Sequence, residues 1–148
     1  MKVGYLTFGR DDFSYGMALC LSRLKDVELY RVTPKTAKYV DVLLFSCFWW
    51  EHIYLLADFL RKAGIKKSDP TRPRIIVGGF NTFNPVRFLP FADAVVCGDG
   101  ETVINQVITG DYSADSVLTG DKKSVLWCNV KPLIGFCHDT DNIGRLEI

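Results

Sequence analysis

Two similar units follow each other in this chain: Arg74-Ile-Ile-Val-Gly-Gly-Phe-Asn-Thr-Phe-Asn-Pro85 and Phe91-Ala-Asp-Ala-Val-Val-Cys-Gly-Asp-Gly-Glu101. Each is a run of β-branched apolar residues that ends in a glycine turn. Glycine lets the backbone adopt positive φ or approach a ligand closely, and parallel α/β folds bind ligands at the carboxyl ends of their strands. The stretch therefore predicts a parallel sheet with a binding site built from strand-end loops.

Strands and helices alternate along most of the chain, with five predicted strands and four predicted helices. Apolar runs bounded by turn residues predict the strands, and helical spacing of apolar residues predicts the helices. The expected elements are strands at Val3–Phe8, Val27–Val32, Val40–Phe45, Ile75–Val77 and Ala94–Cys97, and helices at Ser14–Leu24, Trp50–Ala63, Pro85–Leu89 and Thr102–Ile108. This pattern predicts an α/β fold, a flavodoxin-like (Rossmann-like) three-layer sandwich around a central parallel five-stranded sheet.

The pattern changes after residue 110. Residues 1–110 form the predicted α/β domain, and residues 111–148 a C-terminal extension of short polar turns around one apolar run, Val125–Val130. Gly120-Asp121 is interpreted as a turn that joins two antiparallel strands.

Charge and composition exclude several classes of function. The 148 residues carry a net charge of +1, and their lysines and arginines are spread out, so no nucleic-acid interface is predicted. The longest apolar run, Val42–Trp50, is far shorter than the roughly 20 residues that span a bilayer. A first strand that begins near Lys2 leaves no room for a secretory signal, and we expect a cytoplasmic protein.

The cysteines predict neither a disulfide framework nor a metal site. Five are present, which is an odd number, and none form a CxxC or CxxxCxxC spacing. Three lie within apolar runs, where a reduced thiol behaves as a small hydrophobic side chain.

Each candidate site residue has a structural alternative. Gly78-Gly79 can admit a flat ligand or form an ordinary tight turn, and Ser46 can bind a ligand or cap the following helix. Gly98–Glu101 opens a helix after a strand, but its acidic side chains and the absence of a following Lys-Ser or Lys-Thr argue against a phosphate loop and favour helix capping.

Aromatic residues gather at or just beyond the predicted strand ends, where they should form one rim. They are Phe8, Phe13, Tyr15, Phe48, Trp49, Trp50, Phe80 and Phe83. Such a rim can line a pocket for a large flat ligand, or fill that pocket and form a contact surface for another protein.

Taken together, Ile75-Ile-Val-Gly-Gly79, the Phe-Asn-Pro that follows, the Asp93–Glu101 stretch and Ser46 resemble the cobalamin-binding domain that precedes the barrel in many radical SAM enzymes. The resemblance covers most of the chain. It implies that Ser46, Gly78 and Gly79 line the channel for the nucleotide tail of the cofactor, with Phe80 and Phe48 beside it. It also implies that Gly98, Asp99, Gly100 and Glu101 border the corrin.

Families that ligate cobalt with a histidine carry DxHxxG after the first strand. Asp11, Phe13 and Gly16 have that spacing here, with Phe13 in the place of the histidine. A phenyl ring cannot coordinate cobalt, so the resemblance implies a corrin without a histidine as lower ligand.

The tail Ile143–Ile148 resembles the strand that enters the barrel just before the cysteines of the iron–sulfur centre. Without CxxxCxxC this chain holds no [4Fe-4S] cluster, so catalysis is expected from a radical SAM barrel chain or a C-terminal domain beyond this sequence. We expect a module that is not catalytic alone. The alternatives are a cofactor-free scaffold of the same fold with an aromatic-filled pocket, and a flavodoxin-type flavin or nucleotide binder, which the first loop disfavours because it lacks a Ser/Thr-rich phosphate loop.

Overall fold

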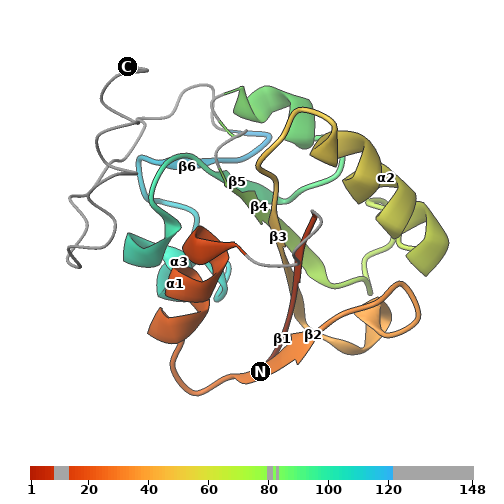
Figure 1. Ribbon diagram of the computed structural model, residues 1–148, viewed down its shortest axis with the longest axis horizontal. Coiled ribbons are helices and arrows are strands. Elements are labelled where there is room, and N and C mark those ends of the chain that lie inside the picture. The colour runs from red at the N-terminus through yellow and green to blue at the C-terminus, as the bar shows by residue number, and fades with distance from the viewer. Residues whose placement is uncertain (9–13, 80–81, 83, 122–148) are drawn as a thin grey trace.

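Six strands form one mixed sheet in the computed structural model, which describes residues 1–8, 14–79, 82 and 84–121 (Figure 1). The strands are β1 (Lys2–Thr7), β2 (Glu28–Arg31), β3 (Val42–Ser46), β4 (Arg74–Gly78), β5 (Ala94–Val96) and β6 (Val117–Leu118). They lie in the order β2-β1-β3-β4-β5-β6. The first five are parallel, and β6 pairs with β5 in the antiparallel direction.

The order of the parallel strands is the one predicted for a doubly wound α/β fold. Five parallel strands lie where the sequence predicts them, and β6, which belongs to the predicted C-terminal extension, adds a sixth, antiparallel strand at the edge. Val117 and Leu118 are buried against β5, and the Cys97 N–H extends the pairing with a 2.8 Å bond to the Ser116 carbonyl. Two residues are too few to show a strand period, so the Gly120-Asp121 turn is the sequence signal for this strand, and the structure supplies its partner, β5.

Helices cover both faces of the sheet. Helix α2 (His52–Ala63) and the 3₁₀ turns η1 (Ala37–Tyr39) and η3 (Pro85–Phe88) cover one face, and α1 (Tyr15–Arg23) and α3 (Ile104–Val107) cover the other (Figure 1). All five residues of β3 are buried, as expected of a central parallel strand. Leu43 and Phe45 point to the α2 face, whereas Val42 and Leu44 point to the α1 face.

Local signals set the ends of the two longer helices. Ser14 is the N-cap of α1, and its hydroxyl accepts the Met17 N–H at 3.2 Å. Gly64 ends α2 in the left-handed conformation, with φ of 63°. Both of these ends agree with the sequence prediction. The start of α2 does not: the prediction places it at Trp50, whereas the helix begins at His52.

The predicted helix over Thr102–Ile108 is wrong in its extent. A 3₁₀ turn η4 (Gly100–Thr102) comes first, and the α-helix α3 has only four residues. The residue between them, Val103, has φ of −118°, which interrupts a continuous helix.

Strand β2 lies at the edge of the sheet, and all four of its residues are exposed. None of the described helices is long and apolar enough to cross a membrane. The domain boundary after residue 110 stays a prediction. The expected run Val125–Val130 and the Ile143–Ile148 strand lie outside the described residues, whereas β6 lies just before the Gly120-Asp121 turn, where one of the two antiparallel strands is expected.

Candidate functional site

Three small polar or glycine positions lie in a row at the carboxyl edge of the sheet. Strand register pairs Thr7 of β1 with Ser46 of β3, and Ser46 with Gly78 of β4. The helix after β1 and the helix after β3 lie on opposite faces of the sheet, so the row begins at the point where the strand order reverses. Ligands of open α/β sheets bind at this point.

The two serines of this region face each other across the switch point. The Ser46 and Ser14 Oγ atoms share a hydrogen bond of 3.2 Å, and Ser46 is only 9% exposed. Ser14 also caps α1, so one side chain joins the helix start to the end of β3. The helix α2 that follows Ser46 has no side-chain cap bond from its N-cap Glu51, and Ser46 bonds across the switch point instead.

Gly78 and Gly79 serve different purposes. A Cβ built on Gly78 would meet Val96 no closer than 3.9 Å, so the fold leaves space there. A Cβ on Gly79 would lie 2.7 Å from the Cys47 carbonyl oxygen, and Gly79 has φ of 106°. The fold itself therefore requires glycine at 79, whereas glycine at 78 keeps space open beside Ser46.

The Gly98–Glu101 turn lies beside the Gly78 position. Val96 touches both glycine positions, because a Cβ on Gly100 would meet its Cγ1 at 3.8 Å. That same Cβ would also lie 3.0 Å from the Cys20 sulfur of α1, so Gly100 permits a close approach of helix and turn. The sequence favours helix capping for this turn; Asp99 is the N-cap residue of η4, but its side chain makes no cap bond.

Burial raises the pKa of one carboxyl in this turn and of a neighbouring thiol. Burial raises the pKa of the Glu101 carboxyl, and the nearby Asp99 raises it further. Burial, followed by the charges of Glu101 and Asp99, raises the pKa of the Cys20 thiol to about 12. Cys20 is therefore a protonated thiol near neutral pH and not a reactive thiolate.

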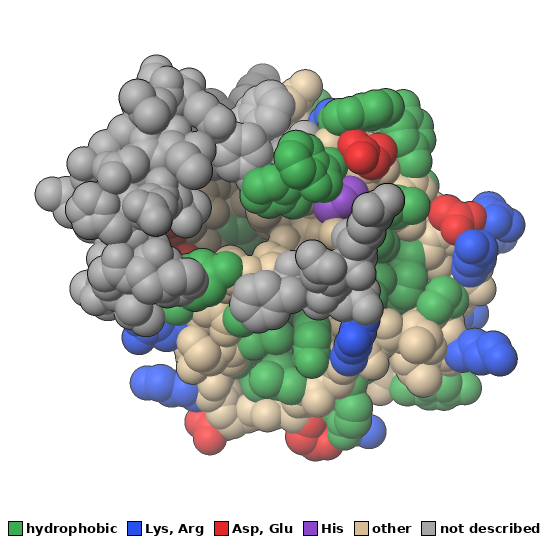
Figure 2. All heavy atoms as spheres, in the orientation of Figure 1, with side chains coloured by type: hydrophobic (Ala, Val, Ile, Leu, Met, Phe, Trp, Pro, Cys, Tyr) green, Lys and Arg blue, Asp and Glu red, His purple; other side chains and the backbone are tan. Residues whose placement is uncertain are grey.

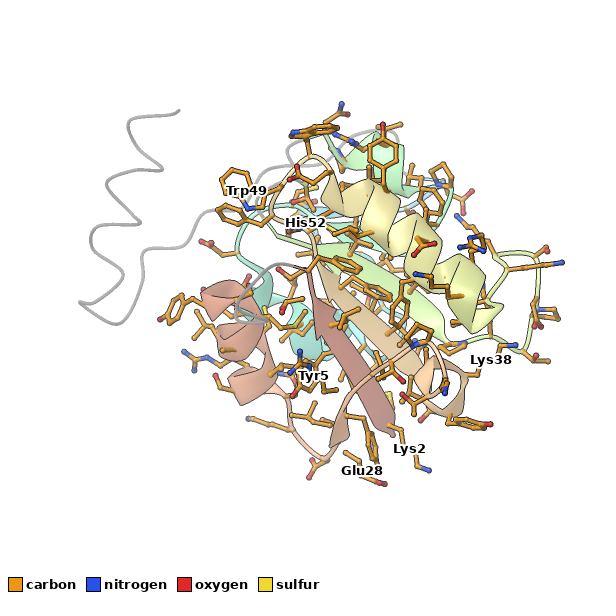
Figure 3. The ribbon with its side chains drawn as sticks, turned by 45° about the vertical axis from the view of Figure 1, so that its right-hand side comes forward. Lys2, Tyr5, Glu28, Lys38, Trp49 and His52 are labelled. Atoms are coloured by element: carbon orange, nitrogen blue, oxygen red, sulfur yellow. The ribbon has the colours of Figure 1, made fainter. Side chains whose placement is uncertain are left out.

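His52 holds the loop that follows Ser46. Its Nδ1 accepts the backbone N–H of Phe48 at 2.9 Å and that of Trp49 at 3.4 Å. The side chain is 3% exposed and contacts the Phe8 ring at 5.8 Å between centroids. Figure 3 shows His52 and Trp49 together, at the end of the molecule opposite Lys2 and Glu28.

The imidazole of His52 is neutral in this setting. Burial lowers its pKa, and the opposing charge of Glu51 is the smaller effect. A ring nitrogen that accepts two N–H groups has no lone pair left for a metal at that atom. His52 is thus a loop-positioning residue.

The described residues contain no group of three or more His, Cys, Asp or Glu side chains that could hold a metal ion. Cys20, Cys47 and Cys97 are free thiols, and Cys128 and Cys137 lie outside the described residues. Burial raises the pKa of Cys47 to about 12, which is consistent with a structural role.

A hollow of about 290 Å³ lies away from the switch point. It is formed where the end of α2 meets the start of β4, and Leu60, Ile65, Ile75 and Phe91 line it together with Lys67. Lys67 donates to the Leu89 and Ala92 carbonyl oxygens, so its ammonium already has partners.

The structure brings together Ser46, Gly78 and Gly79, and places Gly98, Asp99, Gly100 and Glu101 at the end of the strand next to β4. Gly16 is exposed in the first turn of α1. Asp11, Phe13 and Phe80 lie outside the described residues. The assignment of these residues to a cofactor stays a prediction.

The sequence indicated neither the pairing of Ser14 with Ser46 nor the role of His52. The sequence predicts Ser14 only as the start of a helix. The signal for the pairing is that a serine follows or ends each of the neighbouring strands β1 and β3. The role of His52 gives no sequence signal, because its two partners are backbone N–H groups, which nearly every residue carries.

The fold and these loops define a doubly wound α/β domain whose small residues and hydroxyls meet at a switch point. A family model described as "Radical SAM proteins, N-terminal" matches residues 21–133. The chain belongs to this family of radical SAM N-terminal regions. No curated protein matches the chain.

Proposed function

We propose that this domain is the cobalamin-binding-like module of a radical SAM protein and holds a corrin beside a catalytic barrel. The observation that carries the proposal is the row of Thr7, Ser46 and Gly78 at the switch point, where Ser14 is hydrogen-bonded to Ser46. The Gly98–Glu101 turn follows the neighbouring strand β5. Family membership supplies the catalytic context. The module itself is not catalytic.

The chemistry of the residues fits such a ligand. The Ser14 and Ser46 hydroxyls both donate and accept, so they can exchange their mutual bond for polar atoms of the nucleotide tail. Gly78 leaves the space that a larger side chain would close. The Gly98–Glu101 turn would border the corrin edge, and burial raises the pKa of the Glu101 carboxyl there.

When bound, cobalamin would supply methyl transfer or another radical step to the partner's active site. The module would orient the corrin with its upper face open. His52 is the one histidine among the described residues, and its Nδ1 accepts hydrogen bonds from the loop backbone. The proposed corrin would therefore have no imidazole ligand on its lower face.

Gel filtration with hydroxocobalamin tests the cofactor. The wild-type chain is expected to retain corrin absorbance at a one-to-one ratio, and Gly78→Val to lose it with an unchanged circular dichroism spectrum. A wild-type chain that elutes without corrin absorbance rejects the cofactor part of the proposal.

A second candidate is a cofactor-free scaffold of the same fold. Phe8, at the end of β1, stacks on Phe45 with 5.9 Å between centroids and an interplanar angle of 3°, so an aromatic ring fills part of the carboxyl edge. Phe48, by contrast, is 50% exposed and does not fill the crevice. A chain that binds no corrin but still associates with the catalytic barrel would favour this scaffold.

A further inference from the structure

A cluster of large apolar side chains is exposed beside the switch point. We call it the aromatic surface, and its side chains are 46–66% exposed. It comprises Phe48, Trp49, Trp50, Tyr54, Leu55 and Val86. Figure 2 shows hydrophobic side chains gathered at this edge of the molecule, beside the histidine.

The backbone that carries the aromatic surface is held in place. His52 accepts the Phe48 and Trp49 N–H groups, and the Arg87 guanidinium donates to the Trp50 carbonyl at 3.2 Å. This last bond joins the loop to η3. A loop ordered in advance loses little conformational entropy when it is covered by a partner.

The rings themselves form two edge-to-face pairs. Phe48 and Trp49 lie 4.9 Å apart at an interplanar angle of 82°, and Trp50 and Tyr54 lie 6.2 Å apart at 90°. Such geometry is favourable between rings, but it leaves both indole side chains more than half exposed. Trp, Tyr and Arg are the residues most enriched in binding hot spots, and apolar clusters of this kind mark interaction sites.

The position of the aromatic surface indicates its occupant. The loop begins directly after Ser46, so the aromatic surface is continuous with the edge where the proposed corrin would face a catalytic barrel. The chain is the N-terminal region of a radical SAM protein, and the catalytic part of such a protein must lie against this edge if the corrin is to reach it. Glu51 and Arg87 are its charged neighbours, which leaves the centre apolar as in a stable interface.

We propose that the aromatic surface is the face on which the radical SAM catalytic barrel docks. This inference rests on the proposed function for its choice of partner. The rings at residues 48–50 and 54 form the buried centre of the interface, and the bonds made by His52 and Arg87 fix their approach.

Hydroxyl-radical footprinting tests the docking face, because it modifies exposed aromatic side chains. The probe is the 148-residue chain alone, compared with the radical SAM protein in which this region is joined to, or paired with, its CxxxCxxC barrel. Several-fold protection of Trp49, Trp50 and Tyr54 in the assembled protein is expected. Tyr39, which is 76% exposed in η1 away from this loop, is the matched control and should stay unprotected.

Two outcomes overturn the proposal. Equal labelling of the aromatic surface with and without the barrel shows that the barrel docks elsewhere. Protection in the chain alone that rises with its concentration shows that a second copy covers the aromatic surface.

Substitution gives an independent measurement. Trp49→Ser/Tyr54→Ser removes side chains only, since the backbone N–H of Trp49 makes the bond to His52. With the barrel supplied as a separate chain, we expect the double variant to associate with it at least about tenfold more weakly than the wild type. Tyr39→Ser should leave the association unchanged. Hydroxocobalamin retention should be unchanged in the double variant, so a failure of corrin binding and a failure of docking are distinguishable.

Discussion

Gly79 is packed against the backbone of Cys47, with the position of a Cβ only 2.7 Å from the Cys47 carbonyl oxygen and 2.9 Å from its nitrogen. The Cys47 N–H also donates to the Gly78 carbonyl at 2.8 Å. The ends of β3 and β4 are thereby fixed to each other next to Ser46. The second glycine of the pair therefore has a structural role that is independent of any ligand.

Gly79→Ala should destabilise the domain, because the methyl group meets rigid backbone atoms and φ is 106°. We expect a loss of about 2–4 kcal/mol in the free energy of unfolding, measured by urea denaturation. Gly78→Ala is the matched control and should cost less than about 1 kcal/mol, since its Cβ finds ordinary contacts. Equal losses for the two variants would contradict this assignment.

Asp93 links the segment before β4 to the segment before β5. Its oxygens each bind the Arg72 guanidinium at 2.6 Å, and one also accepts the Ile75 N–H at 2.8 Å. Asp93→Ala would leave a largely buried guanidinium without its carboxylate, at an expected cost of about 2–4 kcal/mol. Asp58→Ala, which breaks exposed pairs with Arg61 and Lys62, should cost less than about 1 kcal/mol.

The same ion pair predicts that the stability of the fold falls in acid. Burial raises the pKa of Asp93, but the bonds from Arg72 and the Ile75 N–H outweigh it, so the folded-state pKa lies below the usual value. The stabilisation is therefore present above the unfolded pKa of about 4 and lost as the pH falls through the lower folded value. Asp93→Asn should flatten this part of the stability profile, and an unchanged slope below pH of about 4 would argue against the pair as its source.

His52 predicts a second pH effect at milder acidity. Burial lowers the pKa of His52 in the folded state. Its contribution to the free energy of unfolding is therefore present above the unfolded-state pKa of about 6.5 and is lost as the pH falls through the lower folded-state pKa. Trp fluorescence should report the release of the 48–50 loop in this range. A His138→Asn background leaves His52 as the only histidine, and there His52→Asn should remove the pH response while keeping an acceptor. A response that persists in that variant must come from another group.

Ser14 and Ser46 share one bond but should respond differently to substitution. Ser14→Ala removes the N-cap of α1 and should cost about 1 kcal/mol of stability. Ser46→Ala leaves that cap intact, and we expect a smaller loss of stability together with a marked loss of hydroxocobalamin retention. If Ser46→Ala retained corrin as well as the wild type, its hydroxyl would have a structural role alone.

The interior of the sheet could be predicted because it depends on short-range patterns. Apolar runs, Val42–Phe45 and Ile75–Val77, form most of β3 and β4, and Gly64 and Ser14 are local signals for helix ends that need no distant partner. The sequence predicts a strand before the Gly120-Asp121 turn but not its pairing with β5, because Val117 and Leu118 find that partner only in the folded sheet. The short α3 likewise depends on η4 and not on helix propensity.

The amino-acid sequence by itself determined the class of fold, the order of its elements and the glycine turns at the strand ends, because periodicity and glycine placement are local properties. Only the tertiary structure decided which of those residues meet. It bonded Ser14 to Ser46, required glycine at 79 but not at 78, and placed a buried His52 beneath an exposed aromatic loop. These relationships join residues on different elements, and they arise from packing distances that no local pattern specifies.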